Sequence, residues 1–235
     1  MEKIIPFIMC AVFVLAAYGL LKLSLFISSY VTRKKILSYG VASEDAATAL
    51  FCSYFGMKNV ISNAVLPVYT SAGKRYTEID NIIVLPTCVA VIEIKSMIGR
   101  IENPEGAQTW RQNAVTRSGE IKELDFRNPF IQNDRHAAAV KEALKNMPFA
   151  PPVYGFVVFT SPRVSFVFKN DKILKPTQAV DKLQQLSSRG RKLTGEQKSE
   201  ILTRLRTISK KSWPAFAKQV KMRQGRCTPF REPFW

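Results

Sequence analysis

Two charged side chains stand at the end of an apolar stretch where isolated charges are not expected. Residues 88–96 read C-V-A-V-I-E-I-K-S, and their β-branched composition predicts a strand. Side chains alternate along a strand, so Glu93 and Lys95 share one face with Val89 and Val91. Charges are rarely buried unless they are paired or bound to a metal ion. The pattern therefore indicates an ion pair or part of a functional site.

A second strand is predicted directly before the first. Residues 76–85 are rich in Ile and Val, and Pro86-Thr87 marks a tight turn between the two strands. In this hairpin Asp80 shares a face with Ile82 and Val84. The hairpin places the Asp80 and Glu93 carboxylates on adjacent strands.

A helix before the hairpin supplies another carboxylate. Ser43 is a plausible N-cap, Gly56 ends the helix, and Glu44 opens a mostly apolar stripe. A carboxylate in a first turn either interacts with the helix dipole or contributes to a site. The local sequence leaves both interpretations open.

A helix after the hairpin brings two more polar side chains together. Asn128-Pro129 is a strong helix start, and the helix is expected to run to about residue 146. Gln132 and His136, the only histidine of the chain, are four residues apart and share a face. A lone histidine is more often a satisfied core residue than a functional one.

The composition is that of a globular protein with an unusual charge. The chain has 235 residues, 46% of them hydrophobic, and a formal net charge of +17, which indicates a polyanionic partner. Its four cysteines are scattered, without a C-x-x-C motif. A zinc site or a disulfide framework is therefore not expected, and a reducing compartment fits.

The N-terminus predicts a membrane anchor over residues 1–31. Residues 4–21 contain no charge and are long enough for a transmembrane helix, with a cleaved signal peptide as the alternative. Arg33, Lys34 and Lys35 follow the apolar run. The positive-inside rule then places the N-terminus outside the inner (cytoplasmic) membrane, and the remainder in the cytoplasm as a single-pass protein.

The order of the predicted elements indicates a mixed α/β domain at residues 36–165, with helices packed over a central sheet. Residues 166–235 read as a basic helical extension with helices at 177–187, 194–211 and 213–223 and a tail. From Arg163 to the end there are 18 Lys or Arg against five Asp or Glu. This excess suits a nucleic-acid backbone or anionic lipid equally well.

Several motifs resemble the NERD (nuclease-related) domain, a family similar to the PD-(D/E)XK restriction-endonuclease-like nucleases. They are a helical G-x-x-x-E, then T-E-I-D-N-I-I-V, V-I-E-I-K, G-R-I, W-R-Q and N-P-F-I-Q-N-D-R-H, in this order. The resemblance covers residues 40–160. It implies a restriction-endonuclease-like mixed β-sheet core flanked by helices.

The resemblance also implies roles for individual residues. Asp80, Glu93 and the carbonyl of Ile94 would bind Mg²⁺ or Mn²⁺, and Lys95 would orient the attacking water or neutralise developing charge. Glu44 becomes a further acidic ligand or a helper of the general base. Gln132 would hold the lysine or the substrate backbone, and His136 would support the site or contact a phosphate.

The sequence thus predicts a membrane-anchored, metal-dependent nuclease that acts on nucleic acid, DNA rather than RNA. The alternative is a non-catalytic module that tethers nucleic acid or a partner to the membrane, with the charged cluster serving as a structural ion pair. Whether the chain is an enzyme at all stays open at this point.

Overall fold

The computed structural model describes residues 5–71, 73–103, 106–115 and 119–226. It does not describe the side chains of residues 5–14, 16–17, 27–37 and 223–226. The chain divides into two compact units, residues 1–42 and residues 43–235. The second unit contains every predicted site residue.

The described helices are α1 (Ile5–Phe55), α2 (Pro129–Leu144), α3 (Pro176–Ser187) and α4 (Gly195–Arg226), with a 3₁₀ turn at Met57–Asn59. The strands are β1 (Val60–Thr70), β2 (Gly73–Val84), β3 (Val89–Lys95), β4 (Gly99–Glu102), β5 (Thr109–Val115), β6 (Ile121–Arg127), β7 (Val153–Phe159), β8 (Val164–Phe166) and β9 (Ile173–Leu174).

The larger sheet has the order β1-β2-β3-β7-β9. The β1-β2-β3 pairs are antiparallel, whereas β3-β7 and β7-β9 are parallel. β3 is the central strand, and every residue from Val89 to Ile94 is buried. The site strand is therefore covered on both faces.

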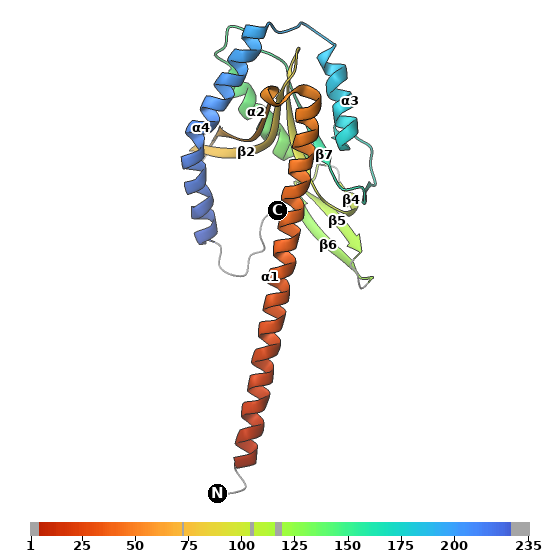
Figure 1. Ribbon diagram of the computed structural model, residues 1–235, viewed down its shortest axis with the longest axis vertical. Coiled ribbons are helices and arrows are strands. Elements are labelled where there is room, and N and C mark those ends of the chain that lie inside the picture. The colour runs from red at the N-terminus through yellow and green to blue at the C-terminus, as the bar shows by residue number, and fades with distance from the viewer. Residues whose placement is uncertain (1–4, 72, 104–105, 116–118, 227–235) are drawn as a thin grey trace. The chain divides into compact units, whose positions relative to one another are not determined.

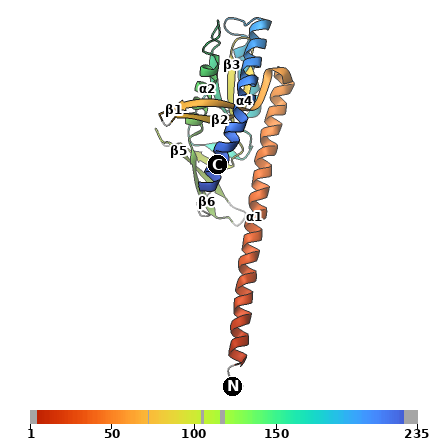
Figure 2. The ribbon, with the colours of Figure 1, turned by 90° about the vertical axis from the view of Figure 1, so that its left-hand side faces the viewer.

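Helices cover both faces of this sheet (Figure 1). On one face, α2 and α4 pack Val140 and Leu205 against Val89 and Val91 of β3. On the other face, the end of α1 and α3 pack Phe51 and Leu183 into a core that includes Ile92. Seen from the side, β1 and β2 reach across to α4 (Figure 2).

A smaller sheet of order β6-β5-β4-β8 lies beside the larger one, and its core also includes Val157 and Phe159 of β7. Trp110 is fully buried there and makes edge-to-face contacts with Phe126, Phe130 and Phe168. Phe130 belongs to the first turn of α2, so this core supports the start of that helix. The predicted mixed α/β fold with flanking helices is confirmed.

Two of the predicted helix boundaries are wrong. α1 passes through Ser43, so Ser43 is not an N-cap, although Gly56, with φ of 82°, follows the helix end as expected. The predicted break near residue 212 is absent, and Pro214 lies inside α4. Contacts on both sides of Pro214 explain this, since Ser209 accepts a hydrogen bond from Val65 N (2.9 Å) and Gln219 bonds to Tyr76.

The predicted membrane anchor is not supported. Within the residues that the structure describes, no helix is both long and apolar enough to cross a membrane. Most side chains of the predicted anchor, residues 1–31, lie outside the described residues. The tail at residues 227–235 also lies outside them.

Candidate active site

β3 presents Glu93 and Lys95 toward α2. Val89 and Val91 pack in the core on the α2 side, whereas Ile92 packs in the opposite core, as strand alternation predicts. Glu93 is 1% exposed. Lys95 is the last residue of the strand, and its side chain is 18% exposed. A buried carboxylate is thus followed by an ammonium group that reaches the surface.

Asp80 lies where the pairing of β2 with β3 ends. The β2–β3 ladder runs from Val84 to Asn81 and stops there. The next residue, Asp80, accepts a hydrogen bond from Ile94 N through its Oδ2, at 2.6 Å. A buried backbone N–H requires a partner, so the side chain replaces the missing strand contact. This bond holds the Asp80 carboxylate against β3 next to Glu93.

The regular alternation predicted for residues 76–85 does not hold at this point. Ile79 and Ile82 lie in the same hydrophobic core, although strict alternation would separate them. On β1, Asn63 lies between the paired residues Ser62 and Ala64 and has a positive φ of 50°, which is uncommon outside glycine. The irregular backbone at Asn63 accompanies the change of face at Asp80.

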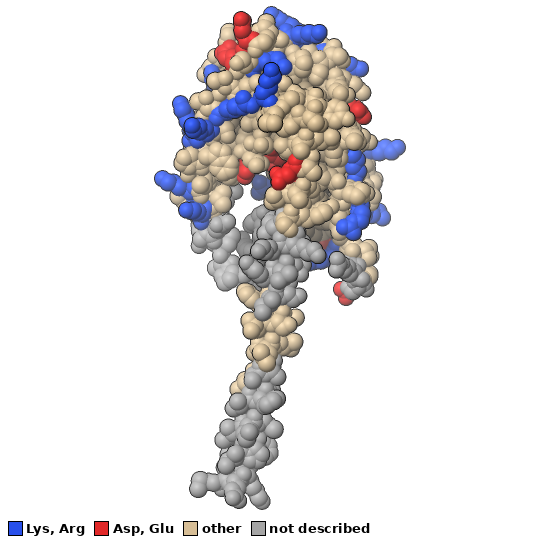
Figure 3. Space-filling model, in the orientation of Figure 1, with Lys and Arg blue, Asp and Glu red and all other residues tan. Residues whose placement is uncertain are grey.

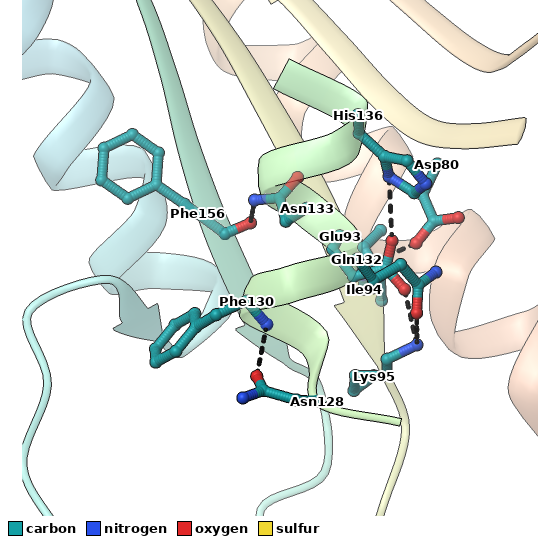
Figure 4. A network of polar contacts seen from close by, with 10 residues as sticks. All are labelled: Asp80, Glu93, Ile94, Lys95, Asn128, Phe130, Gln132, Asn133, His136 and Phe156. Atoms are coloured by element: carbon teal, nitrogen blue, oxygen red, sulfur yellow. Dashed lines mark hydrogen bonds and ion pairs between the residues drawn. The ribbon is translucent and has the colours of Figure 1, made fainter. Parts of the chain in front are cut away.

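A polar network surrounds Glu93 (Figure 4). Its Oε1 lies 2.5 Å from Lys95 Nζ, and its Oε2 lies 3.3 Å from Nδ1 of His136. Lys95 Nζ also donates to Oε1 of Gln132, at 3.4 Å. Gln132 and His136 both come from α2, so their predicted common face is confirmed. The helix thus holds both Lys95 and Glu93 from one side.

The start of α2 is fixed by two asparagines. Asn128 caps the helix, accepting a hydrogen bond from Phe130 N at 2.9 Å. Asn133 donates to the carbonyls of Val91 and Phe156, at 3.3 and 2.9 Å. A Cβ at Gly155 would lie 2.9 Å from the Asn133 amide nitrogen, so the glycine leaves room for this contact.

Sequence reasoning did not identify Asn133 and Gly155 as positioning residues. Two signals were available, since Asn133 interrupts the apolar face of α2 and Gly155 interrupts a strand that is otherwise apolar. Neither signal names its partner, because the contact joins residues that are 22 positions apart.

Glu44 lies in the last part of α1 and is partly buried. No hydrogen bond or ion pair joins it to the other described residues, but Lys95, Glu93 and Glu78 influence its charge. Thr48, one turn later, exchanges hydrogen bonds with Asn81 at 2.9 and 3.2 Å. The end of α1 is therefore anchored to the residue that follows Asp80.

The carboxylates differ in proton affinity. Burial, reinforced by the charge of Glu93, raises the pKa of Asp80 well above its ordinary value. Burial also raises the pKa of Glu44. Burial alone would raise the pKa of Glu93, but Lys95 and His136 outweigh it and lower that pKa. Glu93 is therefore the most strongly ionised of the three.

The carboxylate oxygens of Asp80 and Glu93 supply part of the oxygen ligands that a hard cation requires. Within the described residues, no three His, Cys, Asp or Glu side chains are grouped so as to hold a metal ion, so Glu44 does not complete a triad with Asp80 and Glu93. The Oε2 atom of Glu93 is buried, and its alignment with His136 does not give a hydrogen bond. A buried carboxylate oxygen without a hydrogen bond, beside a second carboxylate, fits Mg²⁺ or Mn²⁺.

Comparison with known proteins identifies the region that contains this site. Residues 43–160 match the nuclease-related domain (NERD) family, which confirms the resemblance seen in the sequence motifs. An uncharacterized protein of Bacillus anthracis is 36% identical over 89 residues. That alignment covers 38% of this chain and 36% of the relative, so the chain spans only about a third of that protein.

Proposed function

We propose that this chain, which belongs to the nuclease-related domain family, is a metal-dependent nuclease. It would hydrolyse phosphodiester bonds of nucleic acid. The observation that carries the proposal is the Asp80–Ile94 hydrogen bond, which holds one carboxylate beside the Glu93–Lys95 pair. The finer classification as restriction-endonuclease-like is part of the proposal.

Asp80, Glu93 and the carbonyl of Ile94 would hold Mg²⁺ or Mn²⁺. Asp80 is supported by β3, and Glu93 has one oxygen without a hydrogen bond. The bound cation supplies a Lewis acid that polarises a phosphoryl oxygen and lowers the pKa of its water.

The chain's own residues perform the remaining tasks. Lys95 is held between Glu93 and Gln132, where its ammonium group orients water and stabilises negative charge that develops on the phosphate. Glu44 accepts a proton from that water, because a raised pKa makes a carboxylate a better base near neutral pH. His136 restrains the Glu93 carboxylate.

The test uses the purified full chain with labelled DNA and RNA oligonucleotides and with Mg²⁺ or Mn²⁺. We expect cleavage that chelation abolishes, with DNA preferred over RNA. Glu93→Ala should abolish activity, whereas Asp171→Ala, which removes an exposed carboxylate before β9, should not. Persistent cleavage by the Glu93→Ala variant would refute the proposed site.

A second candidate function is a non-catalytic module that binds nucleic acid or a partner. It is favoured by the occupation of Glu93 Oε1 by Lys95, which is also the arrangement of a structural ion pair. In that case binding needs no divalent ion, and Asp80→Ala does not change it. The location at a membrane stays a prediction from residues 1–35, and neither candidate depends on it.

A further inference from the structure

We propose that the outer face of α4 binds one strand of a polynucleotide, with lysines on its phosphates and Trp213 stacked on a base. This inference rests on the proposed function, since it assigns the surface that guides that substrate. α4 lies outside the residues that match the nuclease-related family.

The charged residues of α4 beyond Glu200 are all basic. Between Glu200 and Arg226 the sequence has eight Lys or Arg and no Asp or Glu. Four of these side chains are exposed lysines without an ion-pair partner among the described residues, and we call them the basic face: Lys210, Lys211, Lys218 and Lys221. At 3.6 residues per turn they lie within about 100° of one another around the helix. Lys and Arg gather over α4 in the space-filling view (Figure 3).

The apolar face of the first half of this helix is already occupied. Ile201 and Leu205 are fully buried against the sheet, and Gln219 exchanges hydrogen bonds with Tyr76 N and O at 3.0 and 2.9 Å. A helix that lies in a membrane surface inserts its apolar face into the lipid. Because Ile201 and Leu205 of α4 pack on the sheet, they cannot enter a lipid layer, and a polyanionic strand in water is the better partner.

An aromatic ring borders the basic face. Trp213 is 41% exposed and touches Phe216 edge-on, with the ring centroids 5.7 Å apart. It lies three residues after Lys210, about 60° away around the helix. Lysines on phosphates combined with an aromatic ring on a base are the usual means of binding a single strand.

The contact of Gln219 with β2 relates this surface to the candidate active site. Tyr76 precedes Asp80 by four residues in β2, a separation of about 13 Å along the strand. At about 3.4 Å of rise per nucleotide, roughly four nucleotides span that distance. Gln219 lies about 80–180° around α4 from the four lysines, so a strand on the basic face must also pass around the helix and needs more than four nucleotides to extend to the carboxylates.

The first experiment measures binding of a labelled single-stranded DNA of about 20 nucleotides to the full chain, in EDTA so that no cleavage occurs. We expect the triple variant K211Q/K218Q/K221Q to bind about tenfold more weakly. The slope of log K against log salt should become shallower by about 2. The charge-preserving variant K211R/K218R/K221R should bind as the wild type does.

The matched control is K122Q/K169Q/K172Q, which removes the same charge from exposed lysines of β6 and of the segment between β8 and β9. Equal weakening by the control and by the α4 variant would overturn the proposal, because binding would then follow net charge alone. Unchanged binding by the α4 triple variant would also overturn it.

The second experiment tests the aromatic contact and the lipid alternative. Trp213→Ala should weaken DNA binding several-fold without changing the salt slope, and Trp213→Phe should retain most of the affinity. Vesicles that contain phosphatidylserine are tested in parallel. If the triple variant lost vesicle binding but kept DNA binding, α4 would be a lipid surface and the proposal would fail.

These outcomes are independent of catalysis. Binding in EDTA is expected also for Glu93→Ala, whose cleavage should be lost. Strong binding on the basic face without any cleavage would refute the nuclease and retain the strand site. If the lysine substitutions changed neither cleavage nor binding, the nuclease would be retained and the strand site refuted.

Discussion

Lys95 interacts with Glu93 and Gln132 at once, so its substitution separates a structural role from a catalytic one. Lys95→Met leaves the buried Glu93 carboxylate without its ammonium partner, which should cost about 3 kcal/mol of unfolding free energy. It should also lower the cleavage rate by about 10² or more. Urea unfolding and initial rates measure the two effects.

The double variant K95M/E93Q removes both charges and keeps the size of the side chains. It should regain the unfolding free energy that Lys95→Met loses, because no unpaired charge stays buried. It should not regain cleavage, because the carboxylate and the ammonium group are both absent. A double variant that cleaves nucleic acid would contradict the catalytic assignment of both residues.

The raised pKa of Asp80 makes a second prediction at the residue scale. The folded protein holds this proton more tightly than the unfolded chain, so the ionised carboxylate destabilises the metal-free fold at neutral pH. Asp80→Asn should therefore raise the urea midpoint at pH 7, since Asn can still accept from Ile94 N.

The pH dependence gives the sign of that effect. The protonated Asp80 carboxyl contributes to the free energy of unfolding. This contribution is fully present below the ordinary pKa of 3.8 and is lost as the pH rises through the raised pKa of the folded state. The stabilisation by Asn should accordingly vanish in acid and grow toward neutral pH. A substitution that destabilises the metal-free protein at pH 7 would contradict this account.

At the scale of elements, α2 depends on the small space above Gly155. Gly155→Ala places a Cβ 2.9 Å from the Asn133 amide, which must move and weaken its bonds to two carbonyls. We expect a loss of about 1–3 kcal/mol in unfolding free energy. Cleavage should fall as well, because Gln132 and His136 move with α2.

A double-mutant cycle with Asn133→Ala checks the mechanism. The Asn133 bonds can be lost only once, so G155A/N133A should lose clearly less unfolding free energy than the two single variants lose in sum. Full additivity, measured by urea unfolding, would show that Gly155 acts independently of Asn133.

The sequence predicted those elements that depend on local pattern. Strand alternation predicted that Glu93 and Lys95 share a face with Val89 and Val91, and the four-residue spacing in the predicted helix placed Gln132 and His136 on one face. The Asp80–Ile94 bond was not predictable, because it arises where a ladder ends and the backbone at Asn63 becomes irregular. Such features are set by tertiary contacts, which local periodicity does not contain.

Pro214 illustrates the same limit. An internal proline removes one helical hydrogen bond and normally predicts a break. Here Ser209 and Gln219 bond to β1 and β2 on either side of it, so the sheet holds the two halves of α4 in one helix. The sheet contacts outweigh the local preference.

At the scale of the whole molecule, the segment beyond the family match contributes to the same core as the site. Ile201 and Leu205 of α4 pack with Val140 of α2, which lies one turn beyond His136. Substitutions in this core therefore affect the site through α2, whereas substitutions of exposed lysines do not. This difference is the reason that the strand site is tested with exposed positions alone.

Metal-linked stability gives the last prediction at this scale. A cation that binds only the folded chain stabilises it by about 2.7 kcal/mol at 100 times its dissociation constant. We expect Mn²⁺ to raise the unfolding temperature of the full chain at pH 8, and to raise it less as the pH falls. The reason is that the raised pKa of Asp80 makes a proton compete with the ion for the carboxylate.

Asp80→Asn should lose the Mn²⁺ response at every pH, and Asp171→Ala should keep it. A response that survives in Asp80→Asn would place the ion elsewhere, because Asp80 is the carboxylate that β3 holds beside Glu93.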